Sequence, residues 1–340
     1  MNKSSAFVAL SRCEAIGIDV SKATLSVAGL DGSAEHTITL PNTTTAIVEL
    51  TGVLSEHEYS HLILCEATGH YHLNLAIQCV KSGLDLRIIN PLTSSKHSRS
   101  AIRKTKTDPM DARLLATMCL TERRLPKTAT LTPEHVRLQL LRGQLAALEK
   151  HIQSQRQSLH QYRQTCHTLG LGLTDAQQAL LAHVEALARL KKVLEKEFTA
   201  LAAACMDEEQ LARLRSIPGF SASVSSLVGL LDPDVNGADA WVAYVGLDVS
   251  VRQSGTWTGR GKLTKRGNAY LRKRLFQAAW GACLNYKPYR CWYDQLKNKG
   301  RKHAEAVCII ARKLLRIAYH ITRTKTVYDA EKVFGMPVKT

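Results

Sequence analysis

The pattern that most constrains the fold of this chain lies between residues 15 and 120. Three runs of alternating or β-branched residues come first, AIGIDV, TLSVAGL and EHTITL, with a D-G turn between the last two. They predict a meander of three strands. Helical and buried-strand patterns then alternate: a helix near 43–54, a strand in HLILCEATG, a helix near 70–82, a strand in LDLRIIN and a helix over 108–120. The predicted order, βββαβαβα, indicates one α/β domain.

With its first strand at the centre of the sheet, this order resembles the ribonuclease-H-like fold. We therefore expect residues 1–125 to form an α/β domain of that type. In that fold, acidic side chains meet at the ends of the central strands and on the last helix. Asp19 lies on the first predicted strand and Glu66 closes the fourth, so both stand where such acids converge.

A pair of aspartates lies three residues apart in KTKTDPMDARLLA, at positions 108 and 111. In one interpretation, Asp108 caps a helix whose first residue is Pro109, and Asp111 favours the helix dipole. In the other, both carboxylates lie on one helix face, roughly 5–6 Å apart, and bind one hard cation. The two are compatible. If Asp19 and Glu66 join the pair, four carboxylates repel strongly unless a cation intervenes, which predicts Mg²⁺, with Mn²⁺ as a substitute.

Residues 126–210 are rich in Leu and Gln and predict long helices interrupted at TLGLGLTD. Leucines 141, 145 and 148 and Ile152 precede the interruption. A heptad seam with one intruding lysine follows it, at Leu180, Val184, Leu187, Lys191, Leu194, Phe198 and Leu201. The spacing predicts either an antiparallel helical hairpin within the chain or a coiled coil that joins two copies. Both alternatives stay open.

The net charge of +17 is concentrated in the last third of the chain. Residues 215–340 carry 22 Lys and Arg against 8 Asp and Glu, whereas residues 1–125 carry 13 against 12. A merely solubilising surface would spread its charge more evenly. The distribution predicts that the last third faces a polyanion such as nucleic acid.

The last region, residues 211–340, contains LRSIPGFSASVSSLVGLL near its start, and this stretch resembles a helix-hairpin-helix. The turn amides of such an element can meet backbone phosphates. Residues 252–274 then carry eight Lys and Arg and no acid, with Trp257 and Tyr270 expected to stack on bases. The closing helix AEAVCIIARKLLRIAYHI is amphipathic and is expected to pack. The residues predicted to contact nucleic acid are Arg252, Trp257, Arg260, Lys262, Lys265, Arg266 and Arg272.

Five stretches occur in a fixed order along almost the whole chain: GIDVSK, CEATGHY, KTDPMDA, IPGFSASVSSLVGLL and GLDVSVRQSGTWTGRGKLTKRGNAYLR. Together they resemble the DEDD transposases of insertion sequences, a family of serine-dependent, guide-RNA-directed recombinases. The resemblance implies that Asp19, Glu66, Asp108 and Asp111 form the DEDD tetrad of a RuvC-like domain. It also implies that Ser254 is the nucleophile of a C-terminal transposase domain. Chemistry alone does not single out Ser254, because a serine in a Gly-rich loop is usually a turn residue.

By the same resemblance, the protein cuts and rejoins donor and target DNA through a covalent phosphoserine link. A structured guide RNA encoded by the element pairs with both DNAs, and the protein assembles as a dimer or tetramer. No apolar run approaches the ~20 residues that cross a bilayer, and MNKSSAFVALSRCEA has too short an apolar stretch for a signal peptide. We therefore expect a bacterial cytoplasmic protein associated with the nucleoid and not with a membrane.

Other functions stay open at this point. In a metal-dependent structure-specific endonuclease, the tetrad activates water and Ser254 is a loop residue. A nucleic-acid-binding scaffold with a decayed active site is less favoured, because four acids stand in matching positions. A sugar-kinase or actin-like ATPase is also less favoured, because no second Gly-rich phosphate motif is evident in the sequence. The nine cysteines show no C-x-x-C spacing and predict neither a disulfide framework nor a zinc site. They are expected to be small buried hydrophobic residues.

Overall fold

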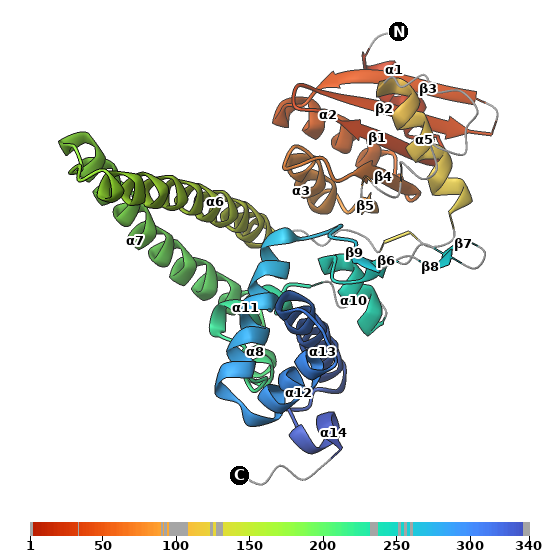
Figure 1. Ribbon diagram of the computed structural model, residues 1–340. Coiled ribbons are helices and arrows are strands. Elements are labelled where there is room, and N and C mark those ends of the chain that lie inside the picture. Colours follow the sequence, from red (N-terminus) through yellow and green to blue (C-terminus); the bar gives the residue numbers. More distant parts are fainter. Residues whose placement is uncertain are drawn as a thin grey trace. The chain divides into compact units, whose positions relative to one another are not determined.

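The chain forms two compact units, Met1–Leu140 and Leu141–Thr340. The computed structural model describes residues 3–32, 34–89, 91, 94, 108–122, 125–126, 132–231, 237–250, 253–254, 257–258 and 261–335. The boundary between the units falls inside the long helix α6 (Pro133–Thr168), which is labelled in Figure 1.

A five-stranded sheet is the framework of the first unit, with the order β3-β2-β1-β4-β5. Strand β1 pairs antiparallel with β2 and parallel with β4, so it lies at the centre as the sequence predicted. Strand β2 pairs antiparallel with β3, and β4 pairs parallel with β5. The strands are β1 Ala15–Val20, β2 Thr24–Asp31, β3 Ala34–Pro41, β4 Leu62–Glu66 and β5 Leu86–Ile89. This order and pairing confirm the ribonuclease-H-like fold.

One face of the sheet is covered by α1 (Lys3–Leu10), α2 (Thr44–Glu56) and α3 (Leu73–Lys81). Their apolar side chains share one buried core with alternate residues of β1, Ile16 and Ile18. The periodicity predicted α2 and α3 correctly. The first helix was not predicted, although Phe7 and Leu10 place it in the same core.

The opposite face is covered by α5 (Asp108–Thr121), where Leu115 and Met118 pack on Leu64 and Ile89. Gly17 explains how close the helix comes to β1. A Cβ atom at Gly17 would lie 2.1 Å from the carbonyl oxygen of Ala112 and 2.3 Å from the amide nitrogen of Ala116. Only glycine leaves room for the backbone of α5 at this point.

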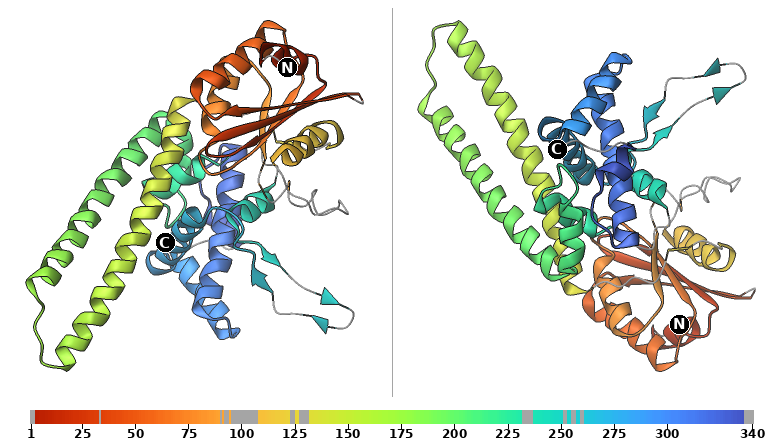
Figure 2. Two further views of the ribbon diagram at one scale, coloured as in Figure 1. Left: turned by 90° about the horizontal axis from the view of Figure 1, so that it is seen from above. Right: turned by 90° about the horizontal axis from the view of Figure 1, so that it is seen from below.

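The second unit begins with two long antiparallel helices, α6 (Pro133–Thr168) and α7 (Asp175–Ala204). Both views in Figure 2 show them side by side, and Ile152, Leu159 and Val184 form the buried seam between them. A capping box in which Thr174 and Gln177 take part starts α7 after the Gly-rich turn. The heptad pattern therefore forms a hairpin within the chain, which was one of the two predicted alternatives. Leu187 packs against this internal seam.

The remaining helices form a bundle around α13 (His303–Thr324), whose apolar stripe is buried, in agreement with the prediction that this helix packs. The helix-hairpin-helix is present as α8 (Glu208–Arg215) and α9 (Ala222–Gly229), with Gly219 in a left-handed conformation at the turn. The other helices are α10 Ala238–Val245, α11 Ala269–Asn285, α12 Lys287–Asn298 and α14 Ala330–Phe334. In the described parts of the chain, no helix has the length and apolar character that spanning a membrane requires.

All nine cysteines lie in the described part of the chain and are free thiols. Five are buried, including Cys65 and Cys79, which agrees with the prediction that they act as small hydrophobic residues. Burial raises the pKa of Cys79 to about 12, so it stays a neutral thiol at neutral pH. Cys291 is exposed and departs from the prediction.

Candidate active site

Asp19 and Glu66 lie side by side at the carboxyl ends of β1 and β4. The two strands pair in parallel, Gly17 with Leu64 and Ile18 with Cys65, so the next position along the register sets Asp19 beside Glu66. Side chains alternate between faces, and both acids therefore share the face on which α5 packs against Gly17. Both carboxylates are half-buried. The register thus brings together two acids that are 47 positions apart in the sequence.

The helix α5 carries the other two acids of the predicted tetrad. Asp111 is half-buried and directly precedes Ala112, whose carbonyl oxygen lies over Gly17. Since Gly17 and Asp19 are two residues apart on one face of β1, Asp111 lies above the same part of the sheet. Helix α5 begins at Asp108, which agrees with the helix predicted over 108–120, whereas the capping interpretation placed the first helical residue at Pro109. The side chain of Asp108 lies outside the described part of the structure.

The donor set at this face consists of carboxylate oxygens, which are the ligands that Mg²⁺ and Mn²⁺ prefer. The chemistry of the residues therefore fits a hard divalent cation. Among the residues that the structure describes, no group of three or more Asp, Glu, His or Cys side chains lies close enough together to hold a metal ion. Asp19 and Glu66 are adjacent, but Asp111 does not complete such a group with them.

Glu66 has one partner that sequence reasoning missed. The Ser94 hydroxyl lies 2.5 Å from Glu66 Oε2 and 3.0 Å from the carbonyl oxygen of Pro91. Ser94 is buried, so its donor stabilises one oxygen of the carboxylate and limits how the side chain can turn. The segment TSSKHSRS around Ser94 shows no periodic pattern, and nothing in it indicates which of its serines meets an acid.

Ser254 lies on a two-stranded arm of the second unit. The base of the arm is formed by β6 (Val249–Ser250) and β9 (Lys262–Leu263), and its outer part by β7 (Gln253–Ser254) and β8 (Trp257–Thr258). Ser254 pairs with Trp257, so only two residues separate it from its partner and it stands at the end of the paired strands. The side chains of Ser254 and Trp257 lie outside the described part. In Figure 2, β7 and β8 lie well away from the helices of this unit.

The six lysines and arginines among the predicted nucleic-acid contacts fall into three groups. Lys262, Lys265 and Arg266 are exposed at the base of the arm, where they can reach a phosphate backbone. Arg272 is half-buried and its Nη1 donates to the carbonyl oxygen of Val245 at 2.9 Å. The two remaining arginines, at positions 252 and 260, lie outside the described residues.

The expectation that Tyr270 stacks on bases is wrong. Only 8% of Tyr270 is exposed, and its hydroxyl accepts a hydrogen bond from Arg274 Nη2 at 3.0 Å. Tyr270 lies in the first turn of α11, one turn before Arg274, which binds Glu195 of α7. An aromatic residue in a basic segment can face either the core or solvent, and sequence alone does not distinguish the two.

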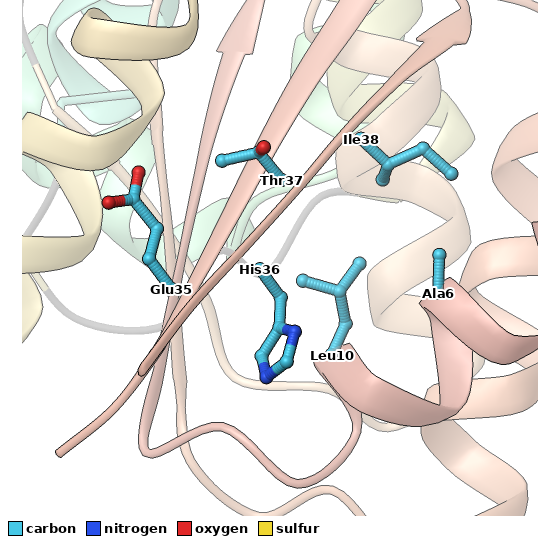
Figure 3. A pocket seen from close by; sticks show the side chains of 6 residues that line it. All are labelled: Ala6, Leu10, Glu35, His36, Thr37 and Ile38. Carbon is cyan, nitrogen blue, oxygen red and sulfur yellow. The ribbon is translucent and has the colours of Figure 1, made fainter. Parts of the chain in front are cut away.

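A cavity of about 300 Å³ lies beside the edge strand β3, away from the acids (Figure 3). Ala6 and Leu10 of α1 line it together with His36 and Ile38. Figure 3 shows Glu35 pointing away from these residues, and its carboxylate binds Arg113 of α5 at 3.1 Å. The cavity is therefore a surface hollow between α1 and β3 and is separate from the candidate site.

Comparison with known proteins places both units in one group. Residues 16–167 match a family model of DEDD transposases related to IS110, described as "Transposase". Residues 211–293 match a second model, described as "Transposase IS116/IS110/IS902 family". The first match contains Asp19, Glu66, Asp108 and Asp111, and the second contains Ser254.

Three curated relatives agree with these matches. The "Pilin gene-inverting protein" of Moraxella bovis is 25% identical over 92% of this chain and 97% of its own length. The protein of the same name from Moraxella lacunata is 24% identical over the same shares. A 43.6 kDa protein of insertion element IS110 from Streptomyces coelicolor is 25% identical over 51% of this chain and 43% of its own length. The sheet order, the placement of the acids and the two family matches together show that this chain belongs to the IS110 family of DEDD transposases, enzymes that act on DNA.

Proposed function

We propose that this transposase cuts and rejoins DNA through a covalent phosphoserine intermediate at Ser254. The observation that supports this most is the place of Ser254 at the end of a paired arm. An arm of this kind can carry a small nucleophile into a DNA backbone. The exposed cations Lys262, Lys265 and Arg266 lie at its base and can hold the neighbouring phosphates.

In the proposed step, the Oγ atom of Ser254 attacks the scissile phosphorus. One P–O bond to the DNA breaks while one P–O bond to serine forms. The proton of the hydroxyl passes to a base, and the departing DNA oxygen takes up a proton. Because the number of phosphate ester bonds is unchanged, the reverse step can rejoin DNA without an external energy source.

The names of two relatives favour recombination over simple cleavage. Both Moraxella proteins are named as inverting a pilin gene. Inversion of a DNA segment requires that every cut end be rejoined to a new partner. A covalent intermediate conserves the bond energy for that rejoining, whereas attack by water does not. The alternative of a metal-dependent endonuclease lacks this second half of the reaction.

We propose that Asp19, Glu66, Asp108 and Asp111 bind Mg²⁺, or Mn²⁺ in its place. When bound there, the cation would stabilise negative charge that develops on the reacting phosphate. The Ser94 hydroxyl would keep Glu66 oriented toward this face of the sheet. Two of these residues belong to the neighbouring strands β1 and β4 and two to α5, so the sheet and the helix would both contribute ligands.

The metal proposal predicts that strand cleavage requires Mg²⁺ or Mn²⁺ and is lost in Asp19→Asn, Glu66→Gln and Asp108→Asn. These changes preserve size and remove charge, so circular dichroism should show a folded protein. We expect Asp111→Asn to be milder, because a capping role alone could explain Asp111. Cleavage that persists in EDTA at an unchanged rate contradicts the metal proposal.

The partners that we propose are donor and target DNA, a structured guide RNA and further copies of the chain. The excess of 22 basic over 8 acidic residues in 215–340 supports binding of polyanions. It does not distinguish RNA from DNA. Sequencing of any nucleic acid that copurifies with the protein would identify a bound guide.

The experiment that tests the serine mechanism uses a DNA substrate interrupted beside the cleavage site. The partner strand is then lost before rejoining, and the covalent adduct accumulates. We expect Ser254→Ala to abolish the adduct and strand exchange while DNA affinity is retained, since a single hydroxyl contributes little to a phosphate-dominated interface. Gel electrophoresis under denaturing conditions measures the adduct.

The matched control is Ser250→Ala, which removes a hydroxyl from the same arm. Ser250 Oγ donates to the carbonyl oxygen of Lys262 at 3.2 Å, and we expect its loss to leave adduct formation intact. If Ser254→Ala cuts DNA at an undiminished rate with divalent metal present, the serine mechanism is wrong and the endonuclease takes its place.

A further inference from the structure

The base of the serine arm is held by contacts between its two strands. The amide of Thr264 donates to the carbonyl oxygen of Asp248 at 3.0 Å, and the amide of Lys265 donates to that of Gly246 at 3.2 Å. The Thr264 hydroxyl donates to the Asp248 carboxylate. These three hydrogen bonds join the two strands next to the paired residues of β6 and β9, on the side nearer to α10 and α11.

Two glycines let the strands of the arm approach α10 closely. Gly246 ends α10 in a left-handed conformation, and a Cβ there would lie 2.5 Å from the carbonyl oxygen of Arg266. Gly267 also has a positive φ, and a Cβ there would lie 2.0 Å from the carbonyl oxygen of Tyr244. Both ends of the arm are thus pressed against the last turn of α10.

Arg272 joins these parts from the first turn of α11. Its Nη1 donates to the carbonyl oxygen of Val245 at 2.9 Å and lies 3.4 Å from that of Lys265. One guanidinium therefore binds the carboxyl end of α10 and the returning strand of the arm at the same time. A cation at this end of α10 also complements the helix dipole.

We propose that Arg272, with the Asp248–Thr264 pair, is a positioning device for the arm that carries Ser254. This inference rests on the proposed serine mechanism. Arg272 then acts through the arm and touches no substrate atom, which differs from its predicted role as a phosphate contact. An arm fixed at its base presents Ser254 in a narrow range of positions, and attack on phosphorus depends steeply on that geometry.

The test compares Arg272→Met with Arg266→Met in the full-length protein. Methionine keeps an unbranched stem of similar length and removes the charge and every donor. Three quantities are measured: hydrogen exchange at the amides of Thr264 and Lys265, the dependence of DNA affinity on salt, and the single-turnover rate of Ser254 adduct formation on bound DNA.

For Arg272→Met we expect faster exchange at both amides, an adduct rate lower by roughly 10- to 100-fold, and a salt slope equal to that of the unmodified protein. Arg266 is exposed and its side chain can therefore meet phosphate, so Arg266→Met should reduce the slope by about 1 and leave exchange at these amides unchanged. Arg272→Lys retains charge and donors, and it should restore part of the protection and of the rate.

Thr264→Val provides a second, nearly isosteric variant in which only the bond to Asp248 is lost. We expect it to shift exchange and adduct rate in the same direction as Arg272→Met. A reduced salt slope with unchanged exchange in Arg272→Met would make Arg272 a phosphate contact and overturn the proposal. An unchanged adduct rate with faster exchange would also overturn it. If the unmodified protein forms no adduct, the serine mechanism fails, while exchange still shows whether Arg272 holds the arm.

Discussion

Gly17 is the residue at which the first unit has least room for a side chain. It lies two positions before Asp19 on the same face of β1, under the backbone of α5. The distances of 2.1 and 2.3 Å from an added Cβ to backbone atoms of α5 are too short for adjustment by a side-chain rotation. The position of α5, which carries Asp108 and Asp111, therefore depends on the absence of a side chain at Gly17, two residues before Asp19.

We predict that Gly17→Ala lowers the free energy of unfolding of the first unit by about 1–3 kcal/mol or more, because α5 must move away from β1. Urea unfolding followed by circular dichroism measures this. The matched control is Gly52→Ala in α2, where an added Cβ meets no atom within 4 Å. Alanine there should raise stability by about 0.5–1 kcal/mol. Equal effects of the two changes would mean that α5 does not pack on Gly17 in solution.

At the scale of elements, a charged network joins the helical hairpin to α11. Glu149 of α6 binds Lys191 of α7 at 3.4 Å and Lys273 of α11 at 3.5 Å. Arg274 of α11 binds Glu195 of α7 and lies 3.8 Å from Glu149. Lys191, the charged residue that interrupts the heptad seam, therefore has two carboxylate partners, Glu149 and Glu195. The network explains why a seam of leucines contains a lysine.

This network predicts a pH dependence of stability. Burial acts to raise the pKa of Glu149, but the attraction of Arg274, Lys191 and Lys273 outweighs it and lowers that pKa below the ordinary 4.5. A carboxyl group whose pKa is lower in the folded state than in the unfolded state stabilises the fold at every pH above its unfolded-state pKa. This contribution is lost as the pH falls through the folded-state pKa. We expect Glu149→Gln to cost about 1–3 kcal/mol at neutral pH and less in acid.

Thermal unfolding of both proteins between about pH 3 and pH 7 measures this difference. The control is Asp294→Asn, which breaks an ion pair with Arg290 on the exposed surface of α12. Both partners are about half exposed, so the change should stay within about 0.5 kcal/mol at every pH. A cost of Glu149→Gln that does not decrease in acid would show that the network does not control this stability.

At the scale of the whole molecule, the basic excess in residues 215–340 determines how the protein meets nucleic acid. We predict that the logarithm of the binding constant falls steeply and linearly with the logarithm of salt concentration, because each neutralised phosphate releases counterions. Replacing Arg260, Lys262, Lys265 and Arg266 with alanine should weaken binding and reduce the slope by up to about 0.9 per lost contact.

Fluorescence anisotropy at several salt concentrations measures both quantities. The control is Trp257→Ala, which should weaken binding and leave the slope unchanged, because stacking on bases involves no counterion release. A flat dependence on salt in the unmodified protein would contradict a phosphate-dominated interface. The apolar seam that includes Leu187 packs between α6 and α7 of the same chain. The seam therefore gives no evidence for an oligomer, and assembly through the helical region stays a prediction.

Local patterns in the sequence determined the order of the elements. Alternation of apolar residues predicted the strands around Asp19, and a proline after Asp108 predicted the start of α5, because both signals depend only on near neighbours. The long helices and the closing amphipathic helix followed from the same periodicity. The acids of the tetrad were also named from sequence, through their places on predicted elements and the resemblance to a family.

Contacts between residues that lie far apart in the sequence could not be predicted and follow from the fold. The register of β1 on β4 sets Asp19 beside Glu66, and the fold brings the Ser94 hydroxyl to that carboxylate. Tyr270 and Arg272 stand in one basic segment, yet one is buried and the other binds two carbonyl groups. The physical reason is that the residues next to a polar or aromatic side chain in the sequence do not determine whether it faces solvent, nucleic acid or the protein's own backbone. Its partner is set by packing between elements that lie far apart in the chain.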